Sequence, residues 1–164
     1  MKKIYYNWQA VEGQTQEILR QIQTSDWLPD YVVGLTRGGL TPANLISQYL
    51  GCRMECLKVS LRDDGSEPEH NLWMAEDAYH GKNILIVDDI NDSGATLNWI
   101  KEDWEDFHPS KREPWKTIWN NNVRFATLVH NEASEFQQID YYSEEINKSV
   151  EDSWIVFPWE DWWK

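Results

Sequence analysis

The stretch Asn83–Thr96, NILIVDDINDSGAT, decides the fold. It begins with the apolar run Ile84–Val87, which is rich in β-branched residues and has no polar alternation. Such a run predicts a strand buried on both faces, as in a parallel sheet. Two acids, Asp88 and Asp89, end the run, and a turn of small polar residues follows at 91–96. Apolar residues then recur at about helical spacing, so we predict a strand, an acidic strand end, a turn and a helix.

This order of elements has a chemical meaning. In open parallel sheets, ligands bind beyond the carboxyl ends of the strands. A turn of small residues that leads into a helix presents backbone N–H groups and a positive dipole end, and both favour a phosphate. Carboxylates repel phosphate, so Asp88 and Asp89 must serve sugar hydroxyls or a divalent cation. We interpret the stretch as a site for a phosphorylated ribose, rather than as a polar strand end with Asp92 as a helix N-cap.

The motif also resembles that of a known family. Val87–Asp89 and Asp92–Thr96 are similar to the phosphoribosyl pyrophosphate motif of the type I phosphoribosyltransferases, in which an apolar run and two acids precede a small-residue loop. The resemblance implies that Asp88 and Asp89 bind ribose hydroxyls, with Asp89 helping to hold Mg²⁺. It implies that Asp92 faces the purine N7 as a general acid or base. The loop that binds the 5′-phosphate would be Asp92, Ser93, Gly94, Ala95 and Thr96.

The rest of the chain predicts further alternating helices and strands. An amphipathic helix is predicted at 9–23, and another helix at Thr41–Leu50, with Pro42 in its first turn. Strands are predicted at three apolar segments: Tyr31–Leu35, Met54–Val59 and Val123–Val129. We therefore predict an α/β fold with a doubly wound, mostly parallel sheet in a single domain, 1–164.

A second candidate site feature follows the strand at Tyr31–Leu35. Arg37, Gly38 and Gly39 form a turn there. Glycine lets the backbone approach a ligand closely, and arginine offers paired donors to phosphate. The run Gly34–Pro42, GLTRGGLTP, resembles the pyrophosphate loop of the bacterial xanthine-guanine phosphoribosyltransferases. The resemblance implies that Arg37 and Gly38 contact pyrophosphate.

Two segments bear on the base. In the purine enzymes of this family a lysine that follows the last apolar strand reads the 6-oxo group, and our alignment puts Asn131 at that place. Asparagine can donate or accept, so the choice of base stays open. The tail pattern Trp154-Ile155 followed by Pro158-Trp159 resembles that of the xanthine-guanine enzymes. This implies that Trp154 covers the base and that the Ile155 backbone contacts its edge. The other tail tryptophans, Trp159, Trp162 and Trp163, are expected in the core.

We predict a role for three further segments of the chain. The polar stretch at about 60–80 is predicted to be a mobile loop that closes over the substrates, as the resemblance implies. The polar insertion at about 107–122 is a candidate oligomer contact, with Trp115 and Trp119 as anchors. The segment at about 150–164 is expected to form a small base-binding hood together with the N-terminal segment.

The composition of the chain limits the kinds of partner and the compartment that we expect for it. A formal charge of −13, from 15 basic and 28 acidic residues, argues against a nucleic-acid partner. Met1-Lys2-Lys3 is not followed by an apolar signal core, and no run reaches membrane-spanning length. The two cysteines, Cys52 and Cys56, fit a reducing compartment, so we expect a cytoplasmic protein. Eleven tryptophans exceed what one small core readily hides, and we expect a homo-oligomer, either a dimer or a tetramer.

Taken together with these patterns, the resemblance implies a Mg²⁺-dependent purine phosphoribosyltransferase of salvage metabolism, which joins phosphoribosyl pyrophosphate to guanine, hypoxanthine or xanthine. Two alternatives remain open. One is a transferase for adenine or a pyrimidine, and the other is a regulator that binds phosphoribosyl pyrophosphate or a nucleotide without turnover. A receiver-type phosphoacceptor domain is excluded, because its acid pair ends the first strand, whereas Asp88 and Asp89 lie far along the chain.

Overall fold

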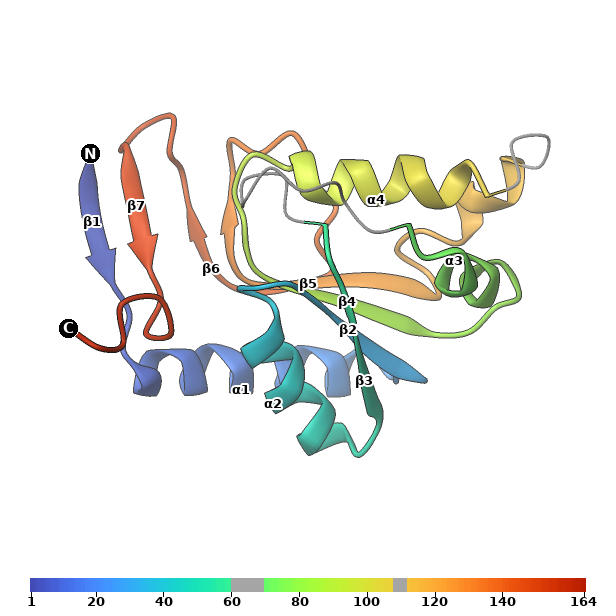
Figure 1. The fold of residues 1–164 in the computed structure, drawn as a ribbon, viewed down its shortest axis with the longest axis horizontal. Coiled ribbons are helices and arrows are strands. Elements are labelled where there is room, and N and C mark those ends of the chain that lie inside the picture. Colours follow the sequence, from blue (N-terminus) through green and yellow to red (C-terminus); the bar gives the residue numbers. More distant parts are fainter. Residues whose placement is uncertain (60–69, 108–111) are drawn as a thin grey trace.

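A five-stranded parallel sheet forms the centre of the computed structural model, which describes residues 1–59, 70–107 and 112–164 (Figure 1). The strand order is β3-β2-β4-β5-β6, and every neighbouring pair is parallel. The predicted doubly wound α/β fold is thereby confirmed. The strands are β2 (Tyr31–Leu35), β3 (Arg53–Leu57), β4 (Ile84–Asn91), β5 (Val123–Asn131) and β6 (Tyr141–Ile146).

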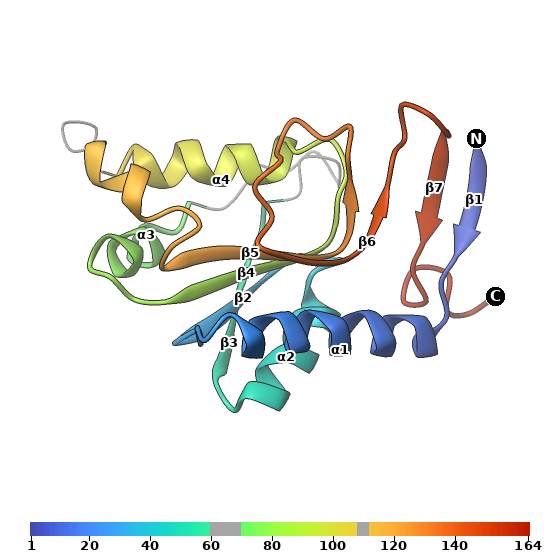
Figure 2. The same cartoon turned by 180° about the vertical axis from the view of Figure 1, so that it is seen from behind.

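Helices cover both faces of this sheet, as the two opposite views show (Figures 1 and 2). One face carries α1 (Trp8–Thr24) and α2 (Leu40–Leu50), and the other carries α3 (Leu72–Tyr79) and α4 (Ala95–Glu105). Successive strand residues point to opposite faces. In β4, the side chains of Ile84 and Ile86 therefore belong to one apolar cluster, and those of Leu85 and Val87 belong to the other. Burial on both faces explains why this strand shows no polar alternation.

Among the boundaries that differ from the sequence prediction, two affect the region of the candidate site. Strand β4 continues to Asn91, because it pairs with β5 along this length, from Ile84 opposite Val123 to Asn91 opposite His130. Asp88 and Asp89 therefore lie within the strand and not beyond it. The expected mobile loop at about 60–80 is wrong for residues 72–79, which form α3 with Met74, Ala75 and Ala78 buried. The first part of that loop, 60–69, lies outside the described residues.

The insertion at about 107–122 belongs to the core of the chain itself. It contains the 3-10 helix η2 (Glu113–Thr117), and residues 108–111 lie outside the described part. Trp115 and Trp119 are buried and stack with ring centroids 5.1 Å apart. The Trp119 indole N–H also donates to Glu105 at 2.8 Å. The prediction that these two tryptophans anchor an oligomer contact is therefore wrong, since they close the apolar cluster beside α4.

A second, two-stranded sheet joins the ends of the described chain. Strand β1 (Lys2–Tyr5) pairs in parallel with β7 (Ser153–Val156), with Lys2 opposite Ser153. We call β1, β7 and residues 157–164 the hood. Figure 1 shows the hood beyond β6, at one end of the molecule. Ile155 and Phe157 are buried in the cluster that also contains α1, and this packing holds the hood to the main sheet.

Candidate active site at the carboxyl ends of the strands

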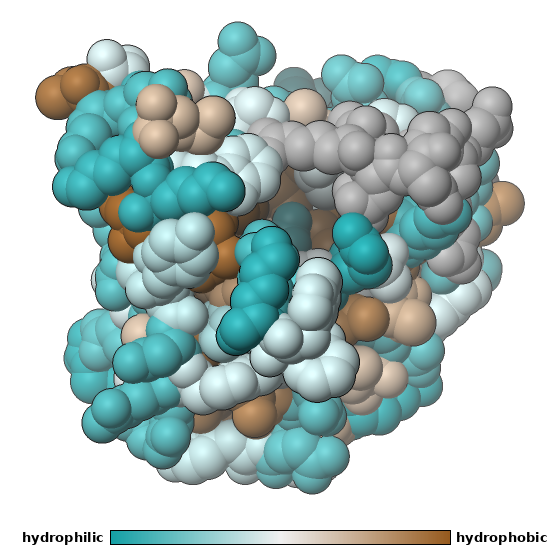
Figure 3. Space-filling model, turned by 60° about the vertical axis from the view of Figure 1, so that its left-hand side comes forward, coloured by the Kyte–Doolittle hydropathy of each residue, from teal (hydrophilic) through white to brown (hydrophobic). Residues whose placement is uncertain are grey.

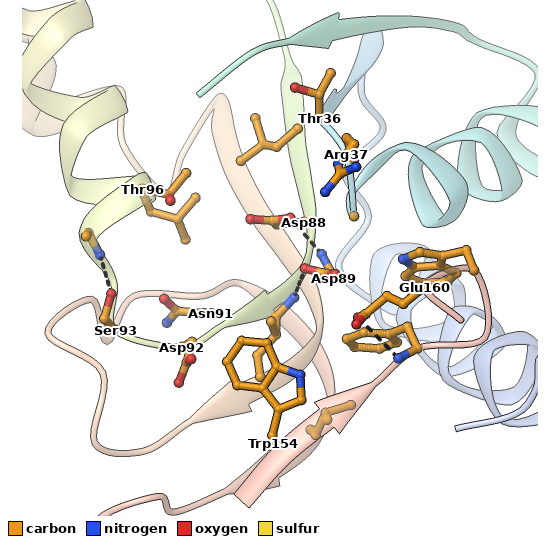
Figure 4. A pocket seen from close by; sticks show the side chains of 18 of the residues that line it. Thr36, Arg37, Asp88, Asp89, Asn91, Asp92, Ser93, Thr96, Trp154 and Glu160 are labelled. Carbon is orange, nitrogen blue, oxygen red and sulfur yellow. Dashed lines mark hydrogen bonds between the residues drawn. The ribbon is translucent and has the colours of Figure 1, made fainter. Parts of the chain in front are cut away.

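One cavity of about 770 Å³ lies where the carboxyl ends of β2 and β4 face the hood. Its walls come from the turn after β2, the end of β4 with the turn that follows, and the tail of the chain. Figure 3 shows the molecule hollowed on the face that carries the hood. Figure 4 shows the acid pair of β4 between Arg37 on one side and Ser93 and Thr96 on the other, with Trp154 below. This is the arrangement expected of a ligand site in a parallel α/β sheet.

The acid pair is held by backbone donors. The N–H of Asp89 donates to Asp88 Oδ1 at 2.9 Å, and the N–H of Ile90 donates to Asp89 Oδ1 at 2.8 Å. The pKa of Asp89 is raised to about 6, chiefly by burial. The nearby Glu160 carboxylate contributes to this rise, and the hydrogen bonds oppose it. A buried carboxylate that titrates near neutrality gains from a cation or a hydroxyl partner, because either one replaces the lost water.

The turn after β2 touches the acid pair directly. A Cβ built on Gly38 would overlap with the Asp89 carboxylate, and one on Gly39 would overlap with the Val87 carbonyl oxygen. Both glycines are therefore required by close approach and not by an unusual backbone angle. Arg37 lies in this turn and lines the cavity, and its peptide bond with Thr36 is cis.

Glu160 of the hood faces the same side of the cavity. Its carboxylate accepts from the N–H of Phe157 at 3.3 Å. Burial raises the pKa of Glu160, while the Arg37 charge works in the opposite direction. The hood therefore adds a further carboxylate to the cavity wall, close enough to feel the charge of Arg37, and sequence reasoning missed it. Its position in the tail, far from the motif, left no local signal.

The turn after β4 forms the start of helix α4. Gly94 has φ +88°, and a Cβ there would lie 2.5 Å from the N–H nitrogen of Phe136, so a larger residue would not fit. Ser93 Oγ accepts from the N–H of Ala95 at 3.3 Å. Helix α4 begins at Ala95, and Thr96 lies in its first turn, at the cavity wall. The positive end of an eleven-residue helix thus faces the cavity, which suits an anion.

The tail of the hood forms the remaining wall. Trp154 and Ile155 line the cavity, with the Trp154 ring partly exposed. The rings of Phe157 and Trp159 stack in parallel, 4.9 Å apart. Trp162 and Trp163 are 74% and 64% exposed, so the prediction that they fill the core is wrong. Both line the cavity.

The comparison with known proteins decides the family. Residues 1–161 match the family described as "Phosphoribosyl transferase domain". The chain belongs to this family. The family that the motifs indicated is thereby confirmed, and the match extends beyond the motifs to nearly the whole chain.

Two curated relatives of this phosphoribosyl transferase carry the name xanthine-guanine phosphoribosyltransferase. The protein of Idiomarina loihiensis is 26% identical over 163 residues, which cover 97% of this chain and 88% of that protein. The protein of Cereibacter sphaeroides is 32% identical over 133 residues, which cover 79% of this chain and 68% of that protein. A similar solved structure is a purine phosphoribosyltransferase from Pyrococcus horikoshii, with a TM-score of 0.70, 26% identity and coverage of 98% and 96%. A Helicobacter pylori xanthine-guanine-hypoxanthine phosphoribosyltransferase shares the fold, with a TM-score of 0.67, 19% identity and coverage of 97% and 94%.

Most of the predicted site residues of this phosphoribosyl transferase meet at the cavity. Those that line it are Arg37, Gly38, Asp88, Asp89, Asp92, Ser93, Gly94, Ala95, Thr96, Trp154 and Ile155. Asn131 is not among the described residues that line the cavity, and it is buried. Its side-chain N–H donates to the Asp92 carbonyl at 3.0 Å, and its oxygen accepts from the N–H groups of Ala133 and Lys148 at 3.2 and 3.0 Å. The structure therefore does not bring Asn131 to the cavity with the other predicted site residues, because its amide holds the backbone behind the site.

Lys148 lines the cavity instead, and sequence reasoning missed it. It lies between β6 and β7, and its Nζ is 3.0 Å from Asp92 Oδ2. The same nitrogen is 5.3 Å from the centroid of the Trp154 ring. A signal was present in the sequence, since Lys148 is the one lysine or arginine between Arg124 and Lys164. An isolated cation in an acidic stretch that leads to Trp154, the residue predicted to cover the base, is a candidate site residue.

Proposed function

We propose that this protein transfers the 5-phosphoribosyl group from phosphoribosyl pyrophosphate to guanine, hypoxanthine or xanthine and releases pyrophosphate, as in purine salvage. One observation carries the proposal: a single cavity joins an acid pair, a helix N-terminus behind a small-residue turn, an arginine and a flat indole. These four features match the ribose hydroxyls, the 5′-phosphate, the pyrophosphate and the base of one bisubstrate complex. The names of the relatives support a purine as the acceptor.

Each part of the substrate has a proposed partner. The 5′-phosphate binds the turn from Asp92 to Thr96, where backbone N–H groups and the α4 dipole offset its charge. Asp88 and Asp89 accept from the ribose hydroxyls. Arg37 binds the pyrophosphate, and Gly38 lets the backbone approach it. The base lies against Trp154, whose indole offers an apolar face, while the Ile155 backbone borders its edge.

The reaction substitutes a base nitrogen for pyrophosphate at C1 of the ribose. The new C1–N bond forms while the C1–O bond to pyrophosphate breaks, and positive charge develops on the ribose ring. The protein contributes position and electrostatics, because it holds both reactants in line and stabilises the leaving anion. Asp92 exchanges a proton with the base at N7, which keeps the base neutral as it becomes part of the nucleotide.

Mg²⁺ fits the donor set of the site. This ion is held in many phosphate-transfer sites by one or two carboxylates, with water and substrate oxygens completing the shell. The described residues contain no group of three or more acids, histidines or cysteines arranged to hold a metal alone. Asp89, with Asp88 beside it, would hold the ion together with the substrate. The bound ion would neutralise charge on the pyrophosphate.

We further infer a cytoplasmic homo-oligomer, either a dimer or a tetramer. The two cysteines of the described chain are free, which fits a reducing compartment. Within the described residues, no helix is both long and apolar enough to cross a membrane. Several large aromatic side chains are exposed, which fits an association surface.

A base panel tests the proposed function. Pyrophosphate release is measured with guanine, hypoxanthine, xanthine, adenine, uracil and orotate, each with Mg²⁺ and phosphoribosyl pyrophosphate. We expect turnover of the 6-oxopurines. Turnover of a pyrimidine alone would overturn the purine assignment, and silence on the whole panel, with retained binding of phosphoribosyl pyrophosphate, would favour the non-catalytic alternative.

A further inference from the structure

Lys148 is fixed at the wall of the cavity by a network behind it. Its backbone N–H donates to Asn131 Oδ1 at 3.0 Å. The preceding Asn147 donates from its side chain to Glu132 at 2.9 Å and accepts from the N–H of Ser149 at 3.0 Å. These bonds tie the loop between β6 and β7 to the end of β5. The Lys148 side chain is only 16% exposed, so its ammonium group is directed into the site and not into bulk water.

The Lys148 ammonium group has more hydrogen-bond donors than its bond to Asp92 uses. A lysine offers three N–H donors and no acceptor. One donor is directed at Asp92 Oδ2, 3.0 Å away. The group also lies 5.3 Å from the centre of the Trp154 ring, which is the proposed platform for the base. A base against Trp154 and beside Asp92 would therefore meet a cation at its edge.

The geometry points to Lys148 as the residue that selects a base with an oxygen at position 6. This inference rests on the proposed function. Asp92 is the proposed partner of N7, and in a purine the substituent at C6 shares one edge with N7. Guanine presents two acceptors on that edge, N7 and O6, whereas adenine presents an acceptor and a donor. A donor-only ammonium beside Asp92 pairs with O6, and it would oppose the 6-amino group of adenine.

The rival explanation is that Lys148 only orients Asp92. The two roles make different kinetic predictions. A lysine that acts only through Asp92 affects every purine alike, because all purines carry N7. A lysine that donates to the 6-oxo group affects only bases that have this group. Pairs of bases that differ at this one atom separate the two roles, namely hypoxanthine against unsubstituted purine and guanine against 2-aminopurine.

The experiment compares kcat/KM for both pairs in the wild type, Lys148→Met and Lys148→Arg. We expect Lys148→Met to lower kcat/KM for hypoxanthine and guanine roughly 10- to 100-fold more than for purine and 2-aminopurine, as the loss of a charge-assisted hydrogen bond implies. Lys148→Arg keeps the donors and should preserve most of the preference. Lys101→Met is the matched control, because Lys101 lies near the Trp119 ring, outside this cavity, and its loss should change neither ratio.

A third variant guards against a folding defect in Lys148→Met. Lys148→Gln keeps a donor and adds an acceptor for a 6-amino group. The kcat/KM for adenine should therefore rise relative to that for hypoxanthine. Circular dichroism and the melting temperature check each variant. An equal loss on both members of each pair would overturn the inference, as would an unchanged adenine-to-hypoxanthine ratio in folded Lys148→Gln. A wild type that turns over no purine would instead refute the proposed function, so the two failures are distinguishable.

Discussion

Gly38 and Gly39 are neighbours in one turn, but an added methyl group would meet different atoms at each. At Gly38 the obstacle is the Asp89 carboxylate, a side chain that can move. At Gly39 the obstacle is the backbone oxygen of Val87, which cannot move because it belongs to the central strand. We therefore expect Gly38→Ala to weaken binding of phosphoribosyl pyrophosphate while the protein stays folded. Gly39→Ala should lower the free energy of unfolding by about 1–3 kcal/mol, as for other overpacked cores.

Calorimetric titration and urea denaturation of both glycine variants check this contrast. The two variants serve as controls for each other, since they add the same atom at adjacent positions. Equal loss of stability in both, with equal loss of binding, would contradict the expected division between site and core.

The acid pair yields a second prediction at this scale. Asp88→Asn combined with Asp89→Asn should weaken binding of phosphoribosyl pyrophosphate in the presence of Mg²⁺ by roughly 100-fold, because two charge-assisted bonds are lost. The free energy of unfolding should stay the same or rise, because burial disfavours the charged form of Asp89 and asparagine carries no charge. Binding by calorimetry and melting in the absence of substrate measure the two effects. Wild-type affinity in the double variant would refute the ribose assignment.

Among single residues, those within one contiguous motif could be predicted from the sequence. Asp88, Asp89 and the turn after them follow each other along the chain, so local pattern suffices to bring them to one site. Lys148 and Asn131 could not be assigned, because their positions depend on how the loop after β6 folds back on β5. Successive side chains of a strand also point to opposite faces of the sheet. An alignment therefore does not show on its own whether the Asn131 side chain faces the cavity.

At the scale of elements, the start of β6 contains a pH-sensitive link to β5. Asp140 Oδ2 accepts from the N–H of Phe125 at 2.8 Å and from the Asn120 side chain at 3.0 Å. Burial nevertheless raises the pKa of Asp140 above its ordinary value. The folded state thus holds this proton more tightly than the unfolded chain does. The stabilising contribution is complete below the ordinary pKa of aspartate and is lost as the pH rises through the raised one.

Asp140→Asn tests this link. The asparagine oxygen can accept both hydrogen bonds that Oδ2 accepts, and it carries no charge to bury. We expect the variant to gain stability relative to the wild type as the pH rises above about 4, the ordinary pKa of aspartate. Urea midpoints across this range measure the difference. If the wild type instead became more stable relative to the variant as the pH rises, the upward direction of the Asp140 pKa shift would be contradicted.

Elements with strong local periodicity were predicted well. Strand β2 matches its prediction, and α2 differs by one residue at its start, because β-branched runs and helix-capping residues act locally. Helix α3 and η2 were missed. Each is short, and its apolar residues are held by the rest of the core: Met74 and Ala78 in α3, and Trp115 in η2. Tertiary burial, and not local propensity, makes these segments helical.

For the whole molecule, the exposed tryptophans carry a prediction. Trp8, Trp73, Trp162 and Trp163 remain at least two-fifths exposed in the single chain. Large exposed aromatic side chains are costly in water and are typical of association surfaces. We expect a sedimentation mass of two or four times 19.5 kDa at micromolar concentration. A monomer under these conditions would refute the proposed oligomer.

The class of fold could be read from the order of strands and helices, but the spatial order of the strands could not. The chain places β4 beside β2, with β3 at the edge. This arrangement depends on which side each crossover takes, and the sequence of one element says little about that choice. The order matters for the site, because it places the turn after β2 against the carboxyl-terminal part of β4, where Gly38 meets Asp89.

The parallel pairing of β1 with β7 has a consequence for the newly made chain. Lys2 finds its partner only when Ser153 has been synthesised. At ribosomal speeds of about 5 to 20 residues per second, this takes roughly 8 to 30 s. During that time β1 lacks its partner strand, and for the later part of it the acids of β4 are already in the nascent polypeptide while Trp154 has not been made. The wall that Trp154 contributes to the cavity therefore forms later than the acid pair that faces it.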